Sequence, residues 1–499
     1  MKIFAACAAL RRSQANSFAR VLRACALCLL VAGLSRATAA AQADPAATPA
    51  TQPEAAAESG APAPEQPAPI SPSTAPAESP SAAGPRIELP PDEQLGEPAA
   101  NAAAASKSAW PSLQFGVTPP DDALLRGLQP TRMAQSSTVV GGYGQFTLNS
   151  VRTGQTHEFD TQASVRRLVL FVAHPITEDI RIYTEFEWEN AVACASCAGS
   201  AEVEQAFVHA RLLGDALAFR AGLVLVPMGI VNQWHEPPVF NGVERPNVDQ
   251  FIIPTTWREL GVGFAGELAE LVRYELYLTT TLNPLRLSET GLTSARTLGS
   301  FAPANAFAVT GRAEVEPILG MIAGASFFAS DMGPNGKYYT QGGKRRSLHL
   351  PLLGYALDAR IRRAGFEARI VWSQFFLPAS DDLVASYRED GSPLFPREAS
   401  IGTVPERIQG GYAELAYNVL DQLHISHELL AFVRLEMFDT QAAVPQGYKR
   451  NPALDIEELT LGLTYRPVTQ LVFKSDLQLR DRRLGYDALQ INLGFGYMF

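Results

Sequence analysis

A strict alternation of side-chain type constrains this chain more than any other feature of its sequence. In LQINLGFGYMF, 489–499, one parity carries only large apolar side chains: Leu489, Ile491, Leu493, Phe495, Tyr497 and Phe499. The other parity carries glycine, polar residues and one methionine. A period of two predicts a β-strand with one face in an apolar medium and the other face in a different environment.

Strand-like segments of this kind recur from Thr138 to the end of the sequence. We expect strands at 138–149, 162–174, 178–189, 203–213, 216–226, 257–267, 271–281, 305–317, 320–330, 352–363, 365–377, 408–420, 427–439, 456–466, 470–481 and 487–499. These segments predict an all-β protein of about sixteen strands.

The connections between these strands alternate in length. Every other connection is short, as at 175–178, 214–215 and 364–365. The alternate connections are mostly long: 190–202, 227–256, 282–304, 331–351, 378–407 and 440–455. Short turns on one side and long loops on the other are typical of an outer-membrane barrel. We therefore expect a transmembrane antiparallel up-and-down β-barrel, closed because lipid offers an open sheet edge no hydrogen-bond partner.

The second face of the strands is charged. It carries Arg181, Glu185, Arg273, Glu275, Arg312, Glu314, Arg360, Arg362, Glu367, Arg369, Arg434, Glu436, Lys474, Asp476 and Arg480. Burying isolated charges in a dry interior is costly, so we expect them to border water. About sixteen strands leave an aqueous channel in a barrel. The alternative, a two-sheet periplasmic sandwich, does not explain the charged inner face.

The region before the strands divides into two parts. Residues 1–41 combine basic residues, the apolar run 24–34 and small residues near Ala41, which is typical of a cleaved signal peptide. Residues 42–135 are rich in alanine and proline, which predicts a disordered periplasmic linker before a barrel over 136–499. The net charge of −10 argues against a nucleic-acid partner.

Metal and catalytic chemistry find little support in the motifs. Cys194 and Cys197 are the cysteines outside the signal peptide, and in an exported protein they predict a disulfide rather than a metal site. His424 and His427 stand in a predicted turn without further metal-ligating residues nearby. G-x-S-x-G and H-E-x-x-H motifs are absent. We expect no catalytic residue, metal or cofactor, and no enzyme activity.

The residues resemble a known group of proteins. The strand 489–499, the number of strands, and RAGLVLVPMGI at 220–230 resemble sixteen-stranded bacterial outer-membrane porins, in particular the phosphate-selective porin O/P-like superfamily. The resemblance implies that the long loop after the fifth strand folds into the lumen as a constriction. It also implies a homotrimer, and it implies that Tyr497 and Phe499 belong to a signal read by the barrel-assembly machinery.

The candidate constriction departs from a phosphate-selective pattern, which would require a ladder of basic residues. Loop 227–256 carries Glu236, Glu244 and Asp249 against His235 and Arg245. We expect this acidic loop to oppose a basic wall that consists of Arg360, Arg362, Arg369 and Arg434, with Lys474 in the same constriction. Opposed charges in a pore tune its ion preference.

The sequence therefore predicts a passive diffusion channel for small hydrophilic solutes or ions in the outer membrane of a Gram-negative bacterium. The alternative is a non-conducting barrel that binds a surface partner, or that tethers the envelope through contact between its linker and peptidoglycan. The pair Arg166 and Arg167 is an exception to the pattern, because strict alternation would place one of them on the lipid face.

Overall fold

The computed structural model describes residues 138–154, 158–194, 197–269, 271–395, 403–423, 425–484 and 487–499. The expected signal peptide and linker lie outside the described residues, as does His424. Within the part of the chain that the structure describes, no helix is long and apolar enough to cross a membrane.

All sixteen predicted strands are present. They are β1 (Val139–Thr153), β2 (Phe159–Pro175), β3 (Ile180–Glu189), β4 (Ala201–Leu213), β5 (Leu217–Leu225), β6 (Arg258–Leu268), β7 (Val272–Thr280), β8 (Phe307–Ile318), β9 (Met321–Asp331), β12 (Pro351–Arg363), β13 (Phe366–Phe376), β14 (Arg407–Asn418), β15 (Glu428–Ala443), β16 (Asp455–Val468), β17 (Leu471–Arg482) and β18 (Ala488–Met498).

The loops contain a few short elements that the alternation could not reveal. Strands β10 (Tyr338–Tyr339) and β11 (Arg345–Arg346) pair as a small separate sheet in the loop after β9. The helical elements are η2 (Val248–Ile252), η3 (Pro284–Arg286), η4 (Thr293–Ala295), η5 (Gly333–Asn335), α3 (Ser380–Val384), η6 (Asp421–Leu423) and η7 (Pro452–Leu454).

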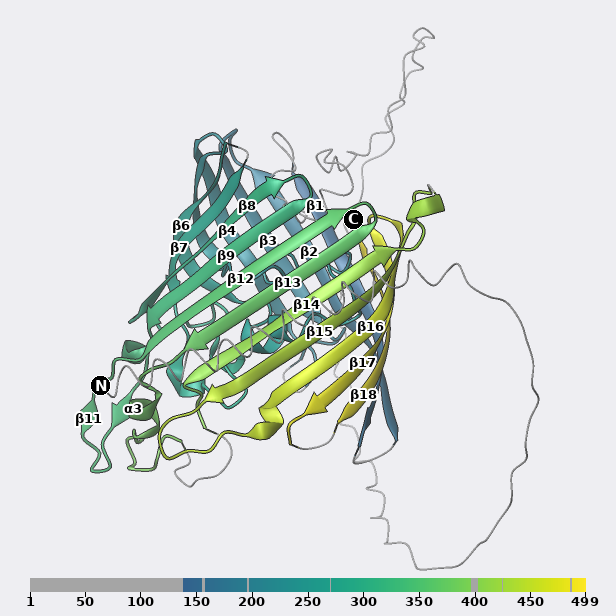
Figure 1. The fold of residues 1–499 in the computed structure, drawn as a ribbon. Coiled ribbons are helices and arrows are strands. Elements are labelled where there is room, and N and C mark those ends of the chain that lie inside the picture. The colour runs from purple at the N-terminus through teal and green to yellow at the C-terminus, as the bar shows by residue number, and fades with distance from the viewer. Residues whose placement is uncertain are drawn as a thin grey trace, which may run out of the picture. The chain divides into compact units, whose positions relative to one another are not determined.

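The sixteen long strands form one closed antiparallel barrel (Figure 1). Each strand pairs with its neighbours in the sequence, and β1 closes the ring by pairing with β18, with Tyr143 opposite Met498. The amide of Gly142 donates to the carbonyl of Phe499 (3.0 Å), and the amide of Phe499 donates to the carbonyl of Gly142 (2.9 Å). Closure satisfies the backbone groups that an open sheet would leave without partners.

The alternation places apolar side chains on the outer face of the barrel. On β3, for example, Ile180, Ile182, Phe186 and Trp188 are exposed, whereas the residues between them are buried or half-buried. Exposed large apolar residues recur on all the barrel strands except β5, β14 and β15. An apolar outer face on a closed barrel is the surface that lipid covers.

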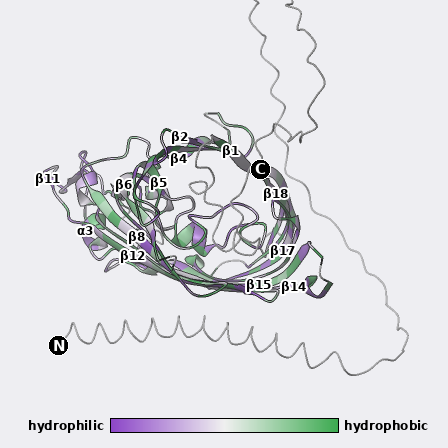
Figure 2. Cartoon of the chain, turned by 90° about the horizontal axis from the view of Figure 1, so that it is seen from above, coloured by the Kyte–Doolittle hydropathy of each residue, from purple (hydrophilic) through white to green (hydrophobic). Residues whose placement is uncertain are grey.

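The interior of the barrel contains a packed core rather than an empty lumen. The view from above shows segments of chain inside the ring of strands (Figure 2). Trp257, at the end of the loop between β5 and β6, lies 4.6 Å from Phe328 of β9 and 6.1 Å from Phe375 of β13, between ring centroids. Apolar residues of several loops pack against inward-facing residues of the strands in one cluster.

Most of the inward charges are buried, so the expectation that they border water is wrong for these residues. The buried ones are Arg181, Glu185, Arg312, Glu314, Arg360, Glu367, Arg434, Glu436, Lys474 and Asp476. Many inward charges lie within salt-bridge distance of a charge of opposite sign, on the same strand or on a nearby one, so they can satisfy one another. Arg312 of β8, for example, contacts Asp358 of β12 at 2.6 Å and Glu314 of β8 at 2.7 Å. Paired and hydrogen-bonded charges tolerate the burial that isolated charges do not.

A β-bulge accounts for the adjacent arginines of β2. Gln145 of β1 lies opposite Arg167 and Phe146 lies opposite Val165, so Arg166 is an extra residue in the ladder. Arg167 is buried, and its guanidinium lies 3.9 Å from the Glu187 carboxylate. A bulge interrupts strict alternation, which removes the conflict that the sequence raised.

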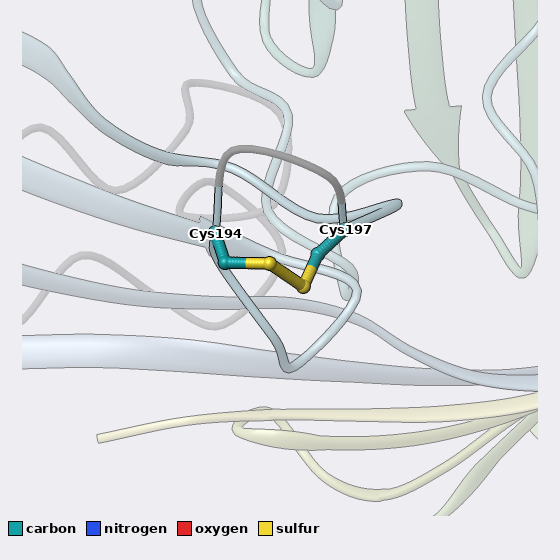
Figure 3. Close-up of a disulfide and its surroundings, with 2 residues drawn as sticks. All are labelled: Cys194 and Cys197. Atoms are coloured by element: carbon teal, nitrogen blue, oxygen red, sulfur yellow. A yellow bond between two sulfur atoms is a disulfide. The ribbon is translucent and has the colours of Figure 1, made fainter. Parts of the chain in front are cut away.

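The loop between β3 and β4 holds a disulfide that joins Cys194 and Cys197 (Figure 3). The ring that it closes is small, and it lies within this loop alone.

Candidate functional site

The loop between β5 and β6, residues 226–257, is the inner loop of the barrel. Asn232 fastens its two ends: the side-chain amide donates to the carbonyls of Val226 (2.7 Å) and Trp257 (3.1 Å). The Asn232 side-chain oxygen also accepts from the Trp257 amide at 2.7 Å. These bonds satisfy buried backbone groups of Val226 and Trp257 through a side chain rather than through strand pairing. They also hold the two ends of the loop together where it enters the lumen.

Three cations of the wall bind consecutive carbonyl groups of the inner loop. Arg369 donates to the carbonyl of Val239 (2.6 Å) and Lys474 donates to that of Phe240 (2.7 Å). Arg434 donates to the carbonyl of Asn241 at 3.2 Å. The sequence predicted that these cations face the carboxylates of the loop across an opening. In the structure they hold the backbone of the loop against β13, β15 and β17.

The remaining bonds of Arg434 are to carboxylates of the wall itself. Its guanidinium lies 3.2 Å from Glu414 of β14 and 3.3 Å from Glu436 of β15, and no part of the side chain is exposed. The Asn241 side chain donates to the other oxygen of Glu414 at 3.0 Å, so the loop and the wall share this carboxylate.

Two further arginines of the predicted wall lie on β12. The guanidinium of Arg360 lies over the ring of Trp234 in the inner loop, 4.0 Å from its centroid, and 3.3 Å from Glu314. Arg362 pairs with Glu367 at 3.4 Å and with Glu428. Arg360 therefore contacts the inner loop through an aromatic face, whereas these two pairs of Arg362 are with the wall.

The acidic residues of the inner loop are spread along it rather than gathered at one point. Glu244 accepts from the side-chain amide of Asn149 on β1 at 2.8 Å. Arg245 donates to the hydroxyl of Thr256 at 3.0 Å. Asp249, at the start of η2, is buried, and its burial together with the nearby Glu436 charge raises its pKa to about 8.

His235 lies at a second contact between the inner loop and the wall. Its Nε2 atom is 2.8 Å from the Glu204 carboxylate of β4. Burial by itself would lower the pKa of His235, but the charges of Glu204, Glu185 and Glu236 outweigh that effect and raise the pKa to about 9. The imidazole of the free protein is therefore a cation at neutral pH. Burial raises the pKa of Glu236, the next residue of the loop.

A pocket opens beside this contact, between the inner loop and strands β1–β5 and β7. It encloses about 740 Å³ of space, including solvent. The charged and polar groups that line it are Glu185, Gln205, Arg220, Gln233, His235, Glu236 and Glu275. The Glu275 carboxylate orients two of these side chains, because it accepts hydrogen bonds from Arg220 (2.9 Å) and from Gln233 (2.6 Å).

Six of the constriction residues predicted from sequence fall into two groups, and Glu244, Arg245, Asp249 and Arg362 belong to neither. Arg360, Arg369, Arg434 and Lys474 contact the inner loop, and His235 and Glu236 line the pocket on the other side of the lumen. Glu204, Gln205 and Arg220 were not predicted as site residues. The adjacent polar pair Glu204 and Gln205 breaks the alternation of β4, and this break is the signal that could have identified the two of them.

A closed ring of antiparallel strands with an apolar outer band and a charged, loop-filled interior is a transmembrane β-barrel. No family model matches the chain. A protein of Aquifex aeolicus (strain VF5), described as uncharacterized, is 28% identical over 350 residues, which cover 68% of this chain and 75% of that protein.

Solved structures of outer-membrane porins are similar to the barrel. OmpF of Salmonella typhi has a TM-score of 0.47 at 12% identity, over 73% of this chain and 98% of OmpF. The outer-membrane channel DcaP of Acinetobacter baumannii has a TM-score of 0.45 at 11% identity, over 72% and 97%. An anion-selective porin of Comamonas acidovorans has a TM-score of 0.45 at 12% identity, over 73% and 99%.

Proposed function

We propose that this protein is an outer-membrane porin, a passive diffusion channel for small hydrophilic solutes or ions that is narrowed by its inner loop. The observation that carries the proposal is the arrangement of that loop. Residues 226–257 cross the interior of a closed barrel, and Arg369, Arg434 and Lys474 hold the segment 239–241 against one side of the wall. The pocket lies beside the loop on the other side.

The passage in this proposal runs along the polar pocket. Its lining carries the carboxylates of Glu185, Glu236 and Glu275 against the cations Arg220 and His235. Charged side chains around a narrow aqueous path set its ion preference. An acidic majority favours cations over anions, which does not support phosphate as the preferred solute even though the sequence resembles the phosphate-selective porin superfamily.

Further parts of the proposal come from the resemblance to porins and from the sequence. They are export by a cleaved signal peptide, insertion by the barrel-assembly machinery through a signal that includes Tyr497 and Phe499, and assembly as a homotrimer. The segment 42–135 serves as a periplasmic spacer, with peptidoglycan as a contact. No catalytic step belongs to this function.

Single-channel recording of the refolded protein in a planar bilayer tests the proposal. We expect stable openings with a linear current–voltage relation, and a reversal potential under a salt gradient that has the sign of a weak cation preference. Glu275→Gln is expected to reduce that preference, since it removes a charge from the lining of the pocket. A correctly folded barrel without openings would contradict the porin function and favour a closed, binding or tethering barrel.

A further inference from the structure

We propose that Glu185, Glu204 and His235 form a binding site for a divalent transition-metal cation of the Zn²⁺ type. The site lies where the inner loop meets the wall of the barrel, and it does not depend on whether the barrel conducts. One ligand atom from each of the three side chains lies within 4.8 Å of the other two, and all three residues are buried.

The three residues come from three separate segments, β3, β4 and the inner loop. A β-bulge positions the central one: Glu185 lies opposite Gln205, and Phe186 lies opposite Val203, so Glu204 is the extra residue of β4. Bulges re-aim side chains, and they are common next to functional sites. The bulge places Glu204 and Gln205 together on the inside of the barrel, where a regular strand would place only one of them.

Glu204 is a buried carboxylate with an incomplete set of partners. The side chain has no exposed surface, and among the described residues its Oε2 atom has no hydrogen-bond donor. Oε1 has only the His235 nitrogen at 2.8 Å. A carboxylate that is removed from water without donors is costly. A cation bound to this oxygen would supply the missing partner.

The groups around the site orient its ligands. Oε2 of Glu185 accepts from the side chain of Gln205 at 2.6 Å and from the Tyr183 hydroxyl at 3.2 Å. Nδ1 of His235 lies 3.3 Å from the carbonyl of Asn232, which leaves Nε2 directed at Glu204. Metal-bound histidines usually donate their second ring nitrogen to a carbonyl or a carboxylate in this way.

The charges near the site are unbalanced. Four carboxylates, those of Glu185, Glu187, Glu204 and Glu236, influence one another electrostatically, and His235, Arg167 and Arg258 are cations that interact with them. When all these groups are ionised, the carboxylates outnumber the cations by one, and a divalent cation would offset that excess. The pocket supplies a path to the site, because Glu185, His235 and Glu236 form part of its lining.

The set of ligand atoms indicates the class of the metal. Ca²⁺ and Mg²⁺ prefer oxygen ligands, whereas imidazole together with carboxylates suits Zn²⁺ and its neighbours in the first transition series. A bound ion would join the inner loop to β3 and β4. The loop would then be attached to both sides of the barrel, by the metal here and by hydrogen bonds to β13, β15 and β17 on the opposite wall.

Calorimetric titration of the full, refolded and chelator-treated protein with Zn²⁺ tests the site. We expect one saturable site whose affinity falls at least about 100-fold in Glu204→Gln and in His235→Gln, and about tenfold in Gln205→Leu, which removes only a group that orients a ligand. His349→Gln is the matched control. His349 also lies 2.8 Å from a carboxylate, that of Asp331, but on the surface, and its loss should leave the affinity unchanged.

Three results would overturn the site: no saturable binding, binding that the Glu204 and His235 variants retain, or binding that His349→Gln abolishes. Anomalous diffraction at the zinc edge from crystals of the unmodified protein makes the test independent of variant folding. A peak between Glu185, Glu204 and His235 is the expected result, and peaks only elsewhere would contradict it. Single-channel recording tests the porin function separately, so the two can fail independently.

Discussion

The ammonium group of Lys474 on β17 contacts Phe240 of the inner loop twice. It donates a hydrogen bond to the Phe240 carbonyl at 2.7 Å, and it lies 3.7 Å from the centroid of the Phe240 ring. A single wall cation thus fixes both the backbone and the side chain of one loop residue. We expect contacts of this kind to restrain how far the inner loop extends into the lumen, and they can be removed one at a time.

Lys474→Met keeps most of the side-chain packing but removes both contacts. We expect the loop to loosen, with a loss of about 1.5–3 kcal/mol of stability for a hydrogen bond to a charged group. Single-channel recording should show a larger and noisier conductance. Lys449→Met removes the same charge from an exposed position in the loop between β15 and β16. Equal conductance in the two variants would show that Lys474 does not restrain the loop.

Asp249 should make stability depend on pH. Its pKa is about 8 in the folded protein, because of burial and the Glu436 charge, and near 3.9 in an unfolded chain. Between about pH 4 and 8 the folded state therefore holds a proton that the unfolded state has lost. Stability is greatest at the acidic end and falls as pH rises towards 8.

The change that tests this dependence is Asp249→Asn, which removes the titrating group. The melting temperature of the variant should fall less than that of the parent protein between pH 5 and pH 9, as judged by circular dichroism. Asp481→Asn, at an exposed position on β17, is the control and should leave the slope unchanged. Parallel slopes in the parent protein and Asp249→Asn would contradict the assignment.

Gly229 occupies a position in the inner loop that only glycine suits. Its φ is +68°, and an added Cβ would lie 2.6 Å from Cδ1 of the buried Ile253. We expect Gly229→Ala to lose about 1–2 kcal/mol for the left-handed backbone and about 1–3 kcal/mol more for overpacking. Gly214→Ala is the control, because its φ is +52° and the added atom has open space around it. Its loss of stability therefore measures the cost of the left-handed backbone alone. Denaturant unfolding should rank Gly229→Ala as the less stable, and the reverse order would contradict the packing argument.

Arg434→Met should be among the most damaging single changes. It leaves the carboxylates of Glu414 and Glu436 without their buried cation, and breaking such a pair costs about 3–5 kcal/mol. Arg483→Met breaks an exposed pair with Asp455 instead, for which we expect less than about 1 kcal/mol. Denaturant unfolding of the refolded variants measures both losses. Similar losses would show that the Arg434 network is solvated rather than buried.

The sequence predicted the strands well because each one carries its own evidence. Alternation is a local property, and the side chains from Ile180 to Trp188 reveal a lipid-facing strand without reference to any other part of the chain. The sorting of short and long connections then predicted a barrel. The bulges at Arg166 and Glu204 interrupt the alternation by one residue, and each does so at a pair of adjacent polar side chains.

The interior was harder to predict because its contacts join distant segments through backbone atoms. The side-chain charges of 227–256 indicated an acidic loop opposite basic strands. The wall cations instead bind the backbone carbonyls of Val239, Phe240 and Asn241. Any residue at these three positions would supply such a carbonyl. The amino-acid composition of the loop therefore carries little information about where the loop binds to the wall. The apolar residues of the loop, such as Trp257, indicated burial but not their partners on β9 and β13.

The pairing of β1 with β18 is the one that we expect to form last during folding. Every other pairing in the ring joins strands that are neighbours along the barrel-forming part of the chain, whereas this one joins its two ends. Until that last pairing forms, both end strands present unpaired edges, which are templates for aggregation. Closure of such a distant contact is entropically slow. The seam between Tyr143 and Met498 is therefore where we expect the rate-limiting step of assembly.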